Sequence, residues 1–250
     1  MATKNKGKIF IGTSNVVIPG NKQSFPDPFK VKSRLNYYAS LFNSVEINSS
    51  FYKVPLPATF EKWSNDVPEE FKFSIKFWKE ITHVKELKFR SADIDKFLNA
   101  SDKAGKNKGP VLLQFPGKIN IGYYNQVESI LENIRSHKTT GKWRIAVEFR
   151  NADWYTRETM ELLDEYKASL VLHDMPKSRN MELNNKAPFV YLRFHGAKGD
   201  YRGTYSNKEL EQYAEKIKGW IKSGKEVFVY FNNTMGNAYE NAMTLKAMTE

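Results

Sequence analysis

Short apolar runs alternate with segments of helical periodicity along the whole chain. The apolar runs, bounded by turn residues, predict strands near 8–14, 44–49, 71–77, 109–115, 143–149, 169–174, 189–195 and 226–233. Amphipathic segments predict helices near 31–42, 57–65, 92–104, 122–136, 156–167, 206–224 and 237–248. This alternation is typical of βαβ units around a parallel sheet. About eight strands predict a closed (β/α)8 TIM barrel, formed by a single domain over residues 1–250.

The clearest helix is predicted over 206–224. Ser206 and Glu209 have the spacing of a capping box, and Gly224 stands where the helix is expected to end. One apolar stripe runs between them at helical spacing, formed by Leu210, Tyr213, Ala214, Ile217 and Ile221. We expect this helix on the outside of the barrel. The segment 175–188 has no such stripe and predicts no helix.

Polar side chains interrupt one face of nearly every predicted strand, toward its carboxyl end. In FVYLRFHG, Arg193 and His195 alternate with apolar residues, and Glu148 in RIAVEFR and Glu46 in SVEINS do the same. Lys76, Gln114, Asp174 and Asn232 occupy similar positions on other strands. An unpaired buried charge is costly, and the carboxyl ends of barrel strands converge on one mouth where active sites lie. The pattern therefore predicts a functional site at this mouth, although pairing of Glu148 with Arg193 or Lys76 would also explain it.

Composition narrows the classes of function. The chain has 39 Lys and Arg against 28 Asp and Glu, a formal net charge of +11, and no cysteine. Thiol nucleophiles, disulfides and thiolate metal sites are therefore excluded. No apolar run is long enough to span a membrane, so we expect a cytoplasmic protein with no membrane partner. The lysines are spread over almost every segment, which favours a solvated surface over a basic block.

Several motifs give the chain a family resemblance. The segments IFIGTSN, VEINSSFY, FKFSIKFWKEITHVKEL, GPVLLQFP, AVEFRNADW, VYLRFHG and VYFNNTMGNAYENA occur in this order from about residue 9 to 247. In these motifs the chain resembles the domain-of-unknown-function 72 family, also called YecE-like. The resemblance implies a TIM-barrel fold but no established reaction. Position by position, it implies site residues Thr13, Glu46, Asn48, Lys76, Gln114, Glu148, Arg150, Asp174, Arg193, His195, Gly196, Asn232 and Asn233.

Our leading hypothesis is an enzyme whose barrel mouth binds an anionic, phosphate-bearing small molecule. Glu46 and Glu148 are predicted to transfer protons in acid–base or hydrolytic chemistry, with His195 as an acid or base and Arg193 and Lys76 as anion binders. The expected substrate-binding residues are Thr13, Asn48, Gln114, Arg150, Asp174, Gly196, Asn232 and Asn233. The hypothesis fails if these side chains are all paired with one another and closed off from solvent.

Glycine-rich loops after the last two strands suggest where a phosphate group binds. The segments are HGAKGDYRG, with Gly196, Gly199 and Gly203, and NNTMGNA, with Gly236 before a helix. TIM barrels frequently bind phosphate through backbone N–H groups of these two loops. Turn geometry alone also explains the glycines.

Other chemistries stay open. Glu46, Glu148, Asp174 and a histidine would suit a divalent metal, although Lys76 and Arg193 would repel the ion. A Schiff base on Lys76 would need a depressed pKa. The basic charge, with aromatic residues of FWKE and ADWY at the rim, would suit nucleic acid and a nuclease-like function. A non-catalytic interaction scaffold is a further alternative. No motif indicates an organic cofactor or a protein partner.

Overall fold

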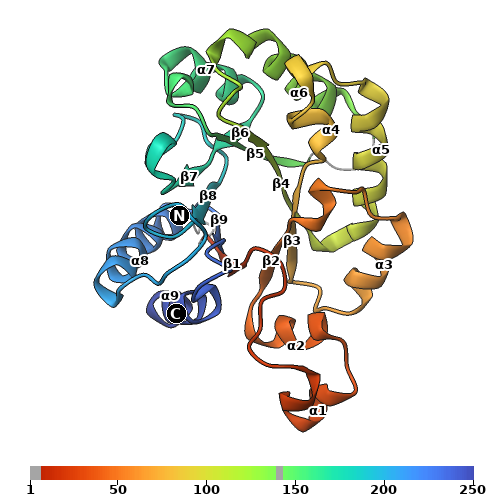
Figure 1. Cartoon of the computed structure of the whole chain (residues 1–250), viewed down its shortest axis with the longest axis vertical. Coiled ribbons are helices and arrows are strands. Elements are labelled where there is room, and N and C mark those ends of the chain that lie inside the picture. The colour runs from red at the N-terminus through yellow and green to blue at the C-terminus, as the bar shows by residue number, and fades with distance from the viewer. Residues whose placement is uncertain (1–6, 139–142) are drawn as a thin grey trace, which may run out of the picture.

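A computed structural model describes residues 7–138 and 143–250. Its strands are β1 (Ile9–Thr13), β2 (Ser44–Ile47), β3 (Lys72–Lys76), β4 (Lys108–Phe115), β5 (Arg144–Phe149), β6 (Ala168–Leu170), β7 (Leu172–His173), β8 (Val190–Phe194) and β9 (Val227–Phe231). Neighbouring strands pair in parallel, and the helices are arranged around them (Figure 1). The predicted α/β class with parallel strands is confirmed.

The strands form two sheets instead of the single closed barrel that the strand count predicts. One sheet has the order β1-β9-β8-β7 and the other β2-β3-β4-β5-β6. At one junction the expected sixth strand is split at Val171, whose N–H donates to the Val147 carbonyl 2.9 Å away, while Leu172 pairs with Leu192 on the other side. At the other junction, β1 and β2 share the isolated bridge between Ser14 and Glu46. The ladder of backbone hydrogen bonds is therefore not closed.

The helices follow the predicted periodicity closely. They are α1 (Asp27–Lys30), α2 (Arg34–Leu41), α3 (Pro57–Asn65), α4 (Lys79–Thr82), α5 (Ser91–Ser101), α6 (Tyr124–Ser136), α7 (Arg157–Glu165), α8 (Asn207–Lys222) and α9 (Ala238–Thr249). The single turns α1 and α4 are too short to show an apolar stripe and were not predicted. Between β7 and β8 the structure has only the short 3-10 turn Pro176–Ser178, which agrees with the missing stripe. No helix in the described residues is long and apolar enough to cross a membrane.

The capping of α8 is as predicted. The Ser206 hydroxyl accepts from the Glu209 backbone N–H at 3.3 Å, and the Glu209 carboxylate accepts from the Ser206 N–H at 2.8 Å. Each bond satisfies a donor that the first turn of a helix leaves unpaired. Gly224 follows the helix with φ +91°, a left-handed conformation that suits glycine.

Two separate apolar clusters confirm the predicted alternation along the strands. Val190, Leu192 and Phe194 pack outward into a large cluster with the helices. The intervening positions contribute to a second cluster inside the strands, formed by Phe10, Leu112, Ala146, Val171, Phe189, Tyr191, Phe228 and Tyr230. This inner cluster draws residues from both sheets, so burying its apolar surface holds the two sheets against each other.

Hydroxyl groups also join the two sheets. The phenol of Tyr191 lies 2.6 Å from the Ser74 hydroxyl, and the phenol of Tyr230 lies 2.6 Å from the Ser44 hydroxyl. All four side chains are buried, and each pair links a strand of one sheet to a strand of the other. A buried hydroxyl without a partner is costly, so these bonds fix how the sheets face each other.

Candidate functional site

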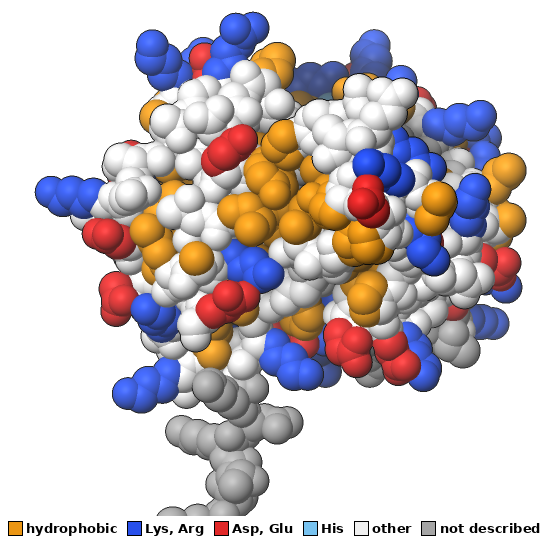
Figure 2. All heavy atoms as spheres, turned by 90° about the horizontal axis from the view of Figure 1, so that it is seen from below, with side chains coloured by type: hydrophobic (Ala, Val, Ile, Leu, Met, Phe, Trp, Pro, Cys, Tyr) orange, Lys and Arg blue, Asp and Glu red, His pale blue; other side chains and the backbone are white. Residues whose placement is uncertain are grey.

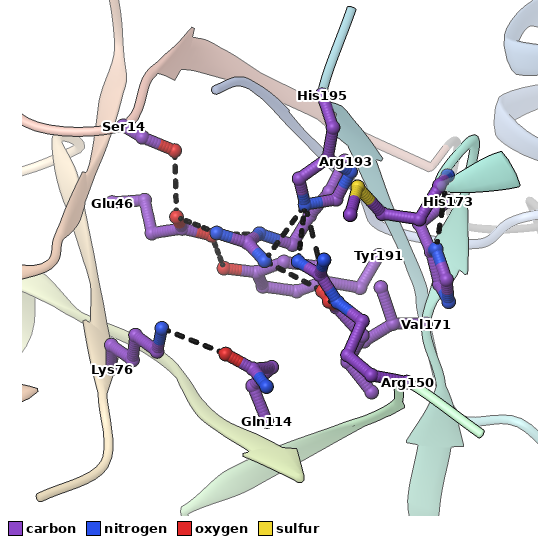
Figure 3. Close-up of polar contacts among 12 residues, drawn as sticks. Ser14, Glu46, Lys76, Gln114, Arg150, Val171, His173, Tyr191, Arg193 and His195 are labelled. Atoms are coloured by element: carbon purple, nitrogen blue, oxygen red, sulfur yellow. Dashed lines mark hydrogen bonds and ion pairs between the residues drawn. The ribbon is translucent and has the colours of Figure 1, made fainter. Parts of the chain in front are cut away.

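Arg193 lies at the centre of a buried polar network above the inner apolar cluster (Figure 3). Its guanidinium donates from Nε to Glu46 Oε2 at 2.9 Å and from NH2 to Glu46 Oε1 at 2.8 Å. Its NH1 donates to Glu148 Oε2 at 2.6 Å. One cation on β8 thus binds carboxylates from β2 and β5, which belong to the other sheet. Arginine suits this position because its fork of donors matches a carboxylate bidentately.

Glu46 is fully hydrogen-bonded. Besides Arg193, its carboxylate accepts from the Ser14 hydroxyl at 2.7 Å, the Tyr191 phenol at 2.7 Å and the Asn48 amide at 3.1 Å. Burial raises the pKa of Glu46, but the charge of Arg193 and these hydrogen bonds outweigh burial and lower the pKa below its ordinary value. Glu46 is therefore an ionised structural anion and no ready proton acceptor.

Glu148 is held in a similar way by two arginines. Arg150 Nε donates to Glu148 Oε1, while Arg193 binds the other oxygen. Burial again raises the pKa of Glu148, and the charges of Arg150 and Arg193 overcome it and bring the pKa well below the ordinary value. Both carboxylates predicted to transfer protons are thus ionised and paired.

The partners of His195 fix its tautomer. Its Nε2 lies 2.9 Å from Arg150 NH2 and 3.1 Å from Arg193 NH1, and both of these groups only donate. Nε2 must therefore accept, so Nδ1 carries the proton and faces Asp174 Oδ1 at 3.2 Å. Burial, together with the arginine charges, lowers the pKa of His195 to about 4. Tyr205 donates to the other Asp174 oxygen and secures this arrangement.

These contacts change the roles predicted for the innermost residues. Glu46, Glu148, Arg193 and His195 are paired with one another and closed off from solvent, each at most 1% exposed. As they stand, none of them can touch a substrate. Strand alternation placed them correctly on the inner face, but it carries no information on which charges pair.

The outer residues of the predicted site are arranged differently. Lys76, at the carboxyl end of β3, is half-buried and donates to the Gln114 amide oxygen at 2.9 Å. Its ammonium lies 4.3 Å from the centre of the Phe51 ring and forms no ion pair with a carboxylate in the described part of the chain. Burial, reinforced by the charges of Arg193 and Arg150, lowers the pKa of Lys76 to about 8. Lys76 is thus a cation without a counterion at the mouth.

Two basic side chains that sequence reasoning missed, His83 and Lys118, lie near Lys76. Burial, reinforced by the nearby charges of Lys76, Lys118 and Arg150, lowers the pKa of His83 to about 4, so His83 is neutral near pH 7. The His83 ring packs edge-on against Phe51 with 4.7 Å between ring centres. His83 and Lys118 stand in loops after β3 and β4, where no periodicity marks an inward-facing residue. We call Lys76, His83, Lys118 and Arg150 the mouth cluster.

An unsatisfied acceptor lies at the edge of the buried network, next to Glu46. The Asn48 amide oxygen is buried and has no hydrogen-bond partner, although its amide nitrogen donates to Glu46. Buried polar atoms without partners are rare in folded proteins.

The other predicted site residues, at the carboxyl ends of β1 and β9, differ in their contacts. Thr13 turns away from the network and donates to the Asn15 carbonyl at 2.6 Å, whereas its neighbour Ser14 contacts Glu46. Asn233 is buried and donates to the Gly203 carbonyl at 3.0 Å. Asn232 is half-buried at the mouth.

The glycine-rich loops use their amide groups within the protein. The Gly196 N–H donates to the Tyr205 phenol at 2.6 Å, and the Gly236 N–H donates to the Asn233 carbonyl at 2.9 Å. The Asn237 N–H donates to the Gly203 carbonyl at 3.0 Å. These donors are not directed at a ligand, so turn geometry explains the glycines better than a phosphate site.

The geometry also argues against a divalent-metal site and against ADWY as an aromatic surface at the rim. Arginines already occupy Glu46 and Glu148, and the described residues contain no group of three acidic or histidine side chains that could hold a metal. In ADWY, Trp154 is fully buried and stacks on Phe149 with 4.2 Å between ring centres, so it does not lie at the rim.

A hollow of about 770 Å³ opens at the opposite, amino end of the strands. Lys8, Lys72, Arg144 and Glu226 contribute to its lining. It is lined mainly by charged side chains, and Arg144 pairs with Glu226 at 2.7 Å.

The fold and the network define an α/β protein with a buried ionic network at the carboxyl ends of parallel strands. The chain belongs to the family described as protein of unknown function DUF72, whose model matches residues 10–250. It is 28% identical over 250 residues to UPF0759 protein YunF of Bacillus subtilis strain 168, covering 85% of this chain and 84% of that protein.

Solved structures share the fold. A DUF72 family protein of Enterococcus faecalis V583, EF0366, aligns with a TM-score of 0.79 at 23% identity, covering 96% of this chain and 95% of the other. The structure titled SacUVDE aligns with a TM-score of 0.58 at 11% identity, covering 97% and 98%.

Proposed function

We propose that the mouth cluster binds an anionic, phosphate-bearing small molecule and that the protein acts on it by acid–base chemistry. The observation that carries the proposal is the Lys76 ammonium, which is partly buried, has no carboxylate partner in the described residues and lies near Arg150, His83 and Lys118. A partly desolvated ammonium without a counterion is unfavourable unless an anion binds there.

The proposal gives Lys76 the chemical role. With a pKa of about 8 in the free protein, Lys76 is mostly protonated near neutral pH, so it can bind the anion as an ammonium and release a proton as a general acid. Glu46 and Glu148 act through Arg193 as positioning residues. Their ion pairs hold Arg193 and Arg150 in place, and Arg150, 12% exposed, is the part of the network nearest to a ligand.

We also propose that the two sheets together form one barrel wall. The ion pairs of Arg193 and the two tyrosine–serine bonds cross the interior between the sheets. The mouth cluster then lies at the carboxyl end of that wall, where barrel enzymes bind their substrates.

A thermal-shift panel tests the proposed function. Phosphate, phosphosugars, nucleotides and short RNA and DNA are added to wild type, Lys76→Met and Lys72→Met at two salt concentrations. Lys72 is a matched control because it lies on the same strand as Lys76, at the amino end. A ligand that binds only the folded state raises the melting temperature. We expect a small phosphorylated compound to stabilise wild type and Lys72→Met but not Lys76→Met.

Two other outcomes would overturn the proposal. Equal stabilisation of all three proteins by small phosphorylated compounds would place the anion outside the mouth. Stabilisation only by nucleic acid, equal in all three and much smaller at high salt, would point to general surface charge. In Figure 2, Lys and Arg are interspersed with Asp and Glu on the face shown, which does not favour this second outcome.

A further inference from the structure

Three exposed apolar side chains lie in loops on the mouth side of the strands. Among the described residues, four large hydrophobic side chains are strongly exposed: Tyr52 at 70%, Leu56 at 71%, Met235 at 59% and Val31 at 84%. Tyr52 and Leu56 lie in the loop between β2 and α3, and Met235 lies in the loop between β9 and α9. Both loops follow the carboxyl ends of strands. Val31 instead follows α1, which projects away from the strands (Figure 1).

The apolar loop after β2 is joined to the mouth cluster through Phe51. One face of the Phe51 ring lies 4.3 Å from the Lys76 ammonium, and its neighbour Tyr52 packs against the ring with 5.1 Å between ring centres. The two rings meet edge to face at an interplanar angle of 85°, and Tyr52 is largely exposed. A ligand bound by Lys76 would thus have an exposed aromatic surface one ring away.

We propose that the anion bound at Lys76 belongs to a molecule that also carries a planar aromatic ring, as a nucleoside phosphate does. The anionic group would pair with the mouth cluster, and the ring would pack on Tyr52 and Leu56. This inference rests on the proposed function, since it assigns the rest of the molecule that the mouth binds.

Two physical arguments support a ring over a plain sugar or an inorganic anion. Exposed apolar side chains that cluster beside a polar site mark binding surfaces, because they lose unfavourable hydration when they are covered. Aromatic side chains bind planar rings by stacking irrespective of the ring's hydrogen-bonding pattern, so Tyr52 needs no polar partner to contribute.

Calorimetric titration tests the inference. Inorganic phosphate, ribose 5-phosphate and adenosine 5′-monophosphate are titrated into wild type, Tyr52→Ala, Val31→Ala and Lys76→Met. The adenine ring is expected to tighten binding to wild type about tenfold over ribose 5-phosphate. Tyr52→Ala should remove this gain and leave ribose 5-phosphate binding unchanged, and Val31→Ala should change neither. Both side chains are exposed, so equal melting temperatures will confirm that the variants fold.

The failure of this inference is distinguishable from the failure of the proposed function. If ribose 5-phosphate and the nucleotide bind wild type equally and both lose binding in Lys76→Met, the ring is not recognised but the anion site stands. If no phosphate compound depends on Lys76, both proposals fail. Sedimentation covers a third case: self-association of wild type that Tyr52→Ala abolishes would show that a second copy covers the apolar loops, and it would overturn the inference.

Discussion

Arg193 on β8 and Glu46 on β2 form a bidentate ion pair between the two sheets, with N–O distances of 2.9 and 2.8 Å. Both side chains are closed off from solvent. Burying an ion pair costs the hydration of both charges. Apolar residues of similar volume often stabilise a fold to the same degree or more. We therefore interpret the main role of the pair as fixing the orientation of the residues around the mouth, and not as adding stability.

Removal of Arg193 should destabilise the protein strongly. In Arg193→Met, Glu46 and Glu148 lose a buried counterion, and breaking a buried pair from one side typically costs about 3–5 kcal/mol. Urea unfolding measures this change. Arg157→Met is the matched control, because Arg157 forms an exposed pair with Glu161 at 2.7 Å and exposed pairs contribute at most about 1 kcal/mol. Equal losses in the two variants would show that the buried network does not hold the sheets together.

His195 should make stability depend on pH in mildly acidic solution. Its pKa falls from 6.5 to about 4 in the folded protein, so between these values the unfolded chain binds a proton that the folded protein does not. Stability is then fully present above about pH 6.5 and is lost as the pH falls toward 4, with a slope of up to about 1.4 kcal/mol per pH unit from this residue.

Urea unfolding of wild type and His195→Gln at pH 7, 6 and 5 checks the sign. We expect a shallower pH dependence in the variant, although His83, whose pKa is also lowered to about 4, should keep part of it. An unchanged slope would mean that His195 is not the neutral acceptor that its contacts indicate.

Two glycines should respond in opposite ways to the addition of a methyl group. A Cβ at Gly236 would lie 2.3 Å from the Gly203 carbonyl oxygen, so Gly236→Ala must push apart the two loops that follow β8 and β9. A Cβ at Gly219, within α8, meets nothing within 4 Å, so Gly219→Ala should stabilise the helix by about 0.5–1 kcal/mol. Thermal unfolding measures both. A Gly236→Ala protein as stable as wild type would show that the loops are not packed this closely.

Strand alternation predicted the inner polar face because Arg193, Glu148 and Glu46 interrupt apolar runs at regular intervals. It did not predict their pairing, since pairing depends on register and on the direction of long side chains across the interior. The break between β6 and β7 arises where Val171 bonds to β5 and Leu172 pairs with β8, and the apolar pattern does not encode this switch of partner.

The accessible part of the site was the hardest to predict. Phe51 ends the short 3-10 helix Ser49–Phe51 and His83 follows the single turn α4, and segments this short have no periodicity that says which way a side chain points. Lys76 was singled out correctly as an inward-facing cation. Its lack of a counterion follows only from the geometry, because Glu46 and Glu148 are engaged by arginines.

The most direct test of the anion site is the pKa of Lys76, measured by NMR of its side chain with and without inorganic phosphate. Lys76→Met identifies the resonance. The pKa should be near 8 in the free protein, and a bound anion should raise it because a negative charge stabilises the ammonium. A pKa of Lys76 that stays the same at saturating concentrations of phosphate and of phosphorylated sugars and nucleotides would contradict the claim that the mouth binds anions through this residue.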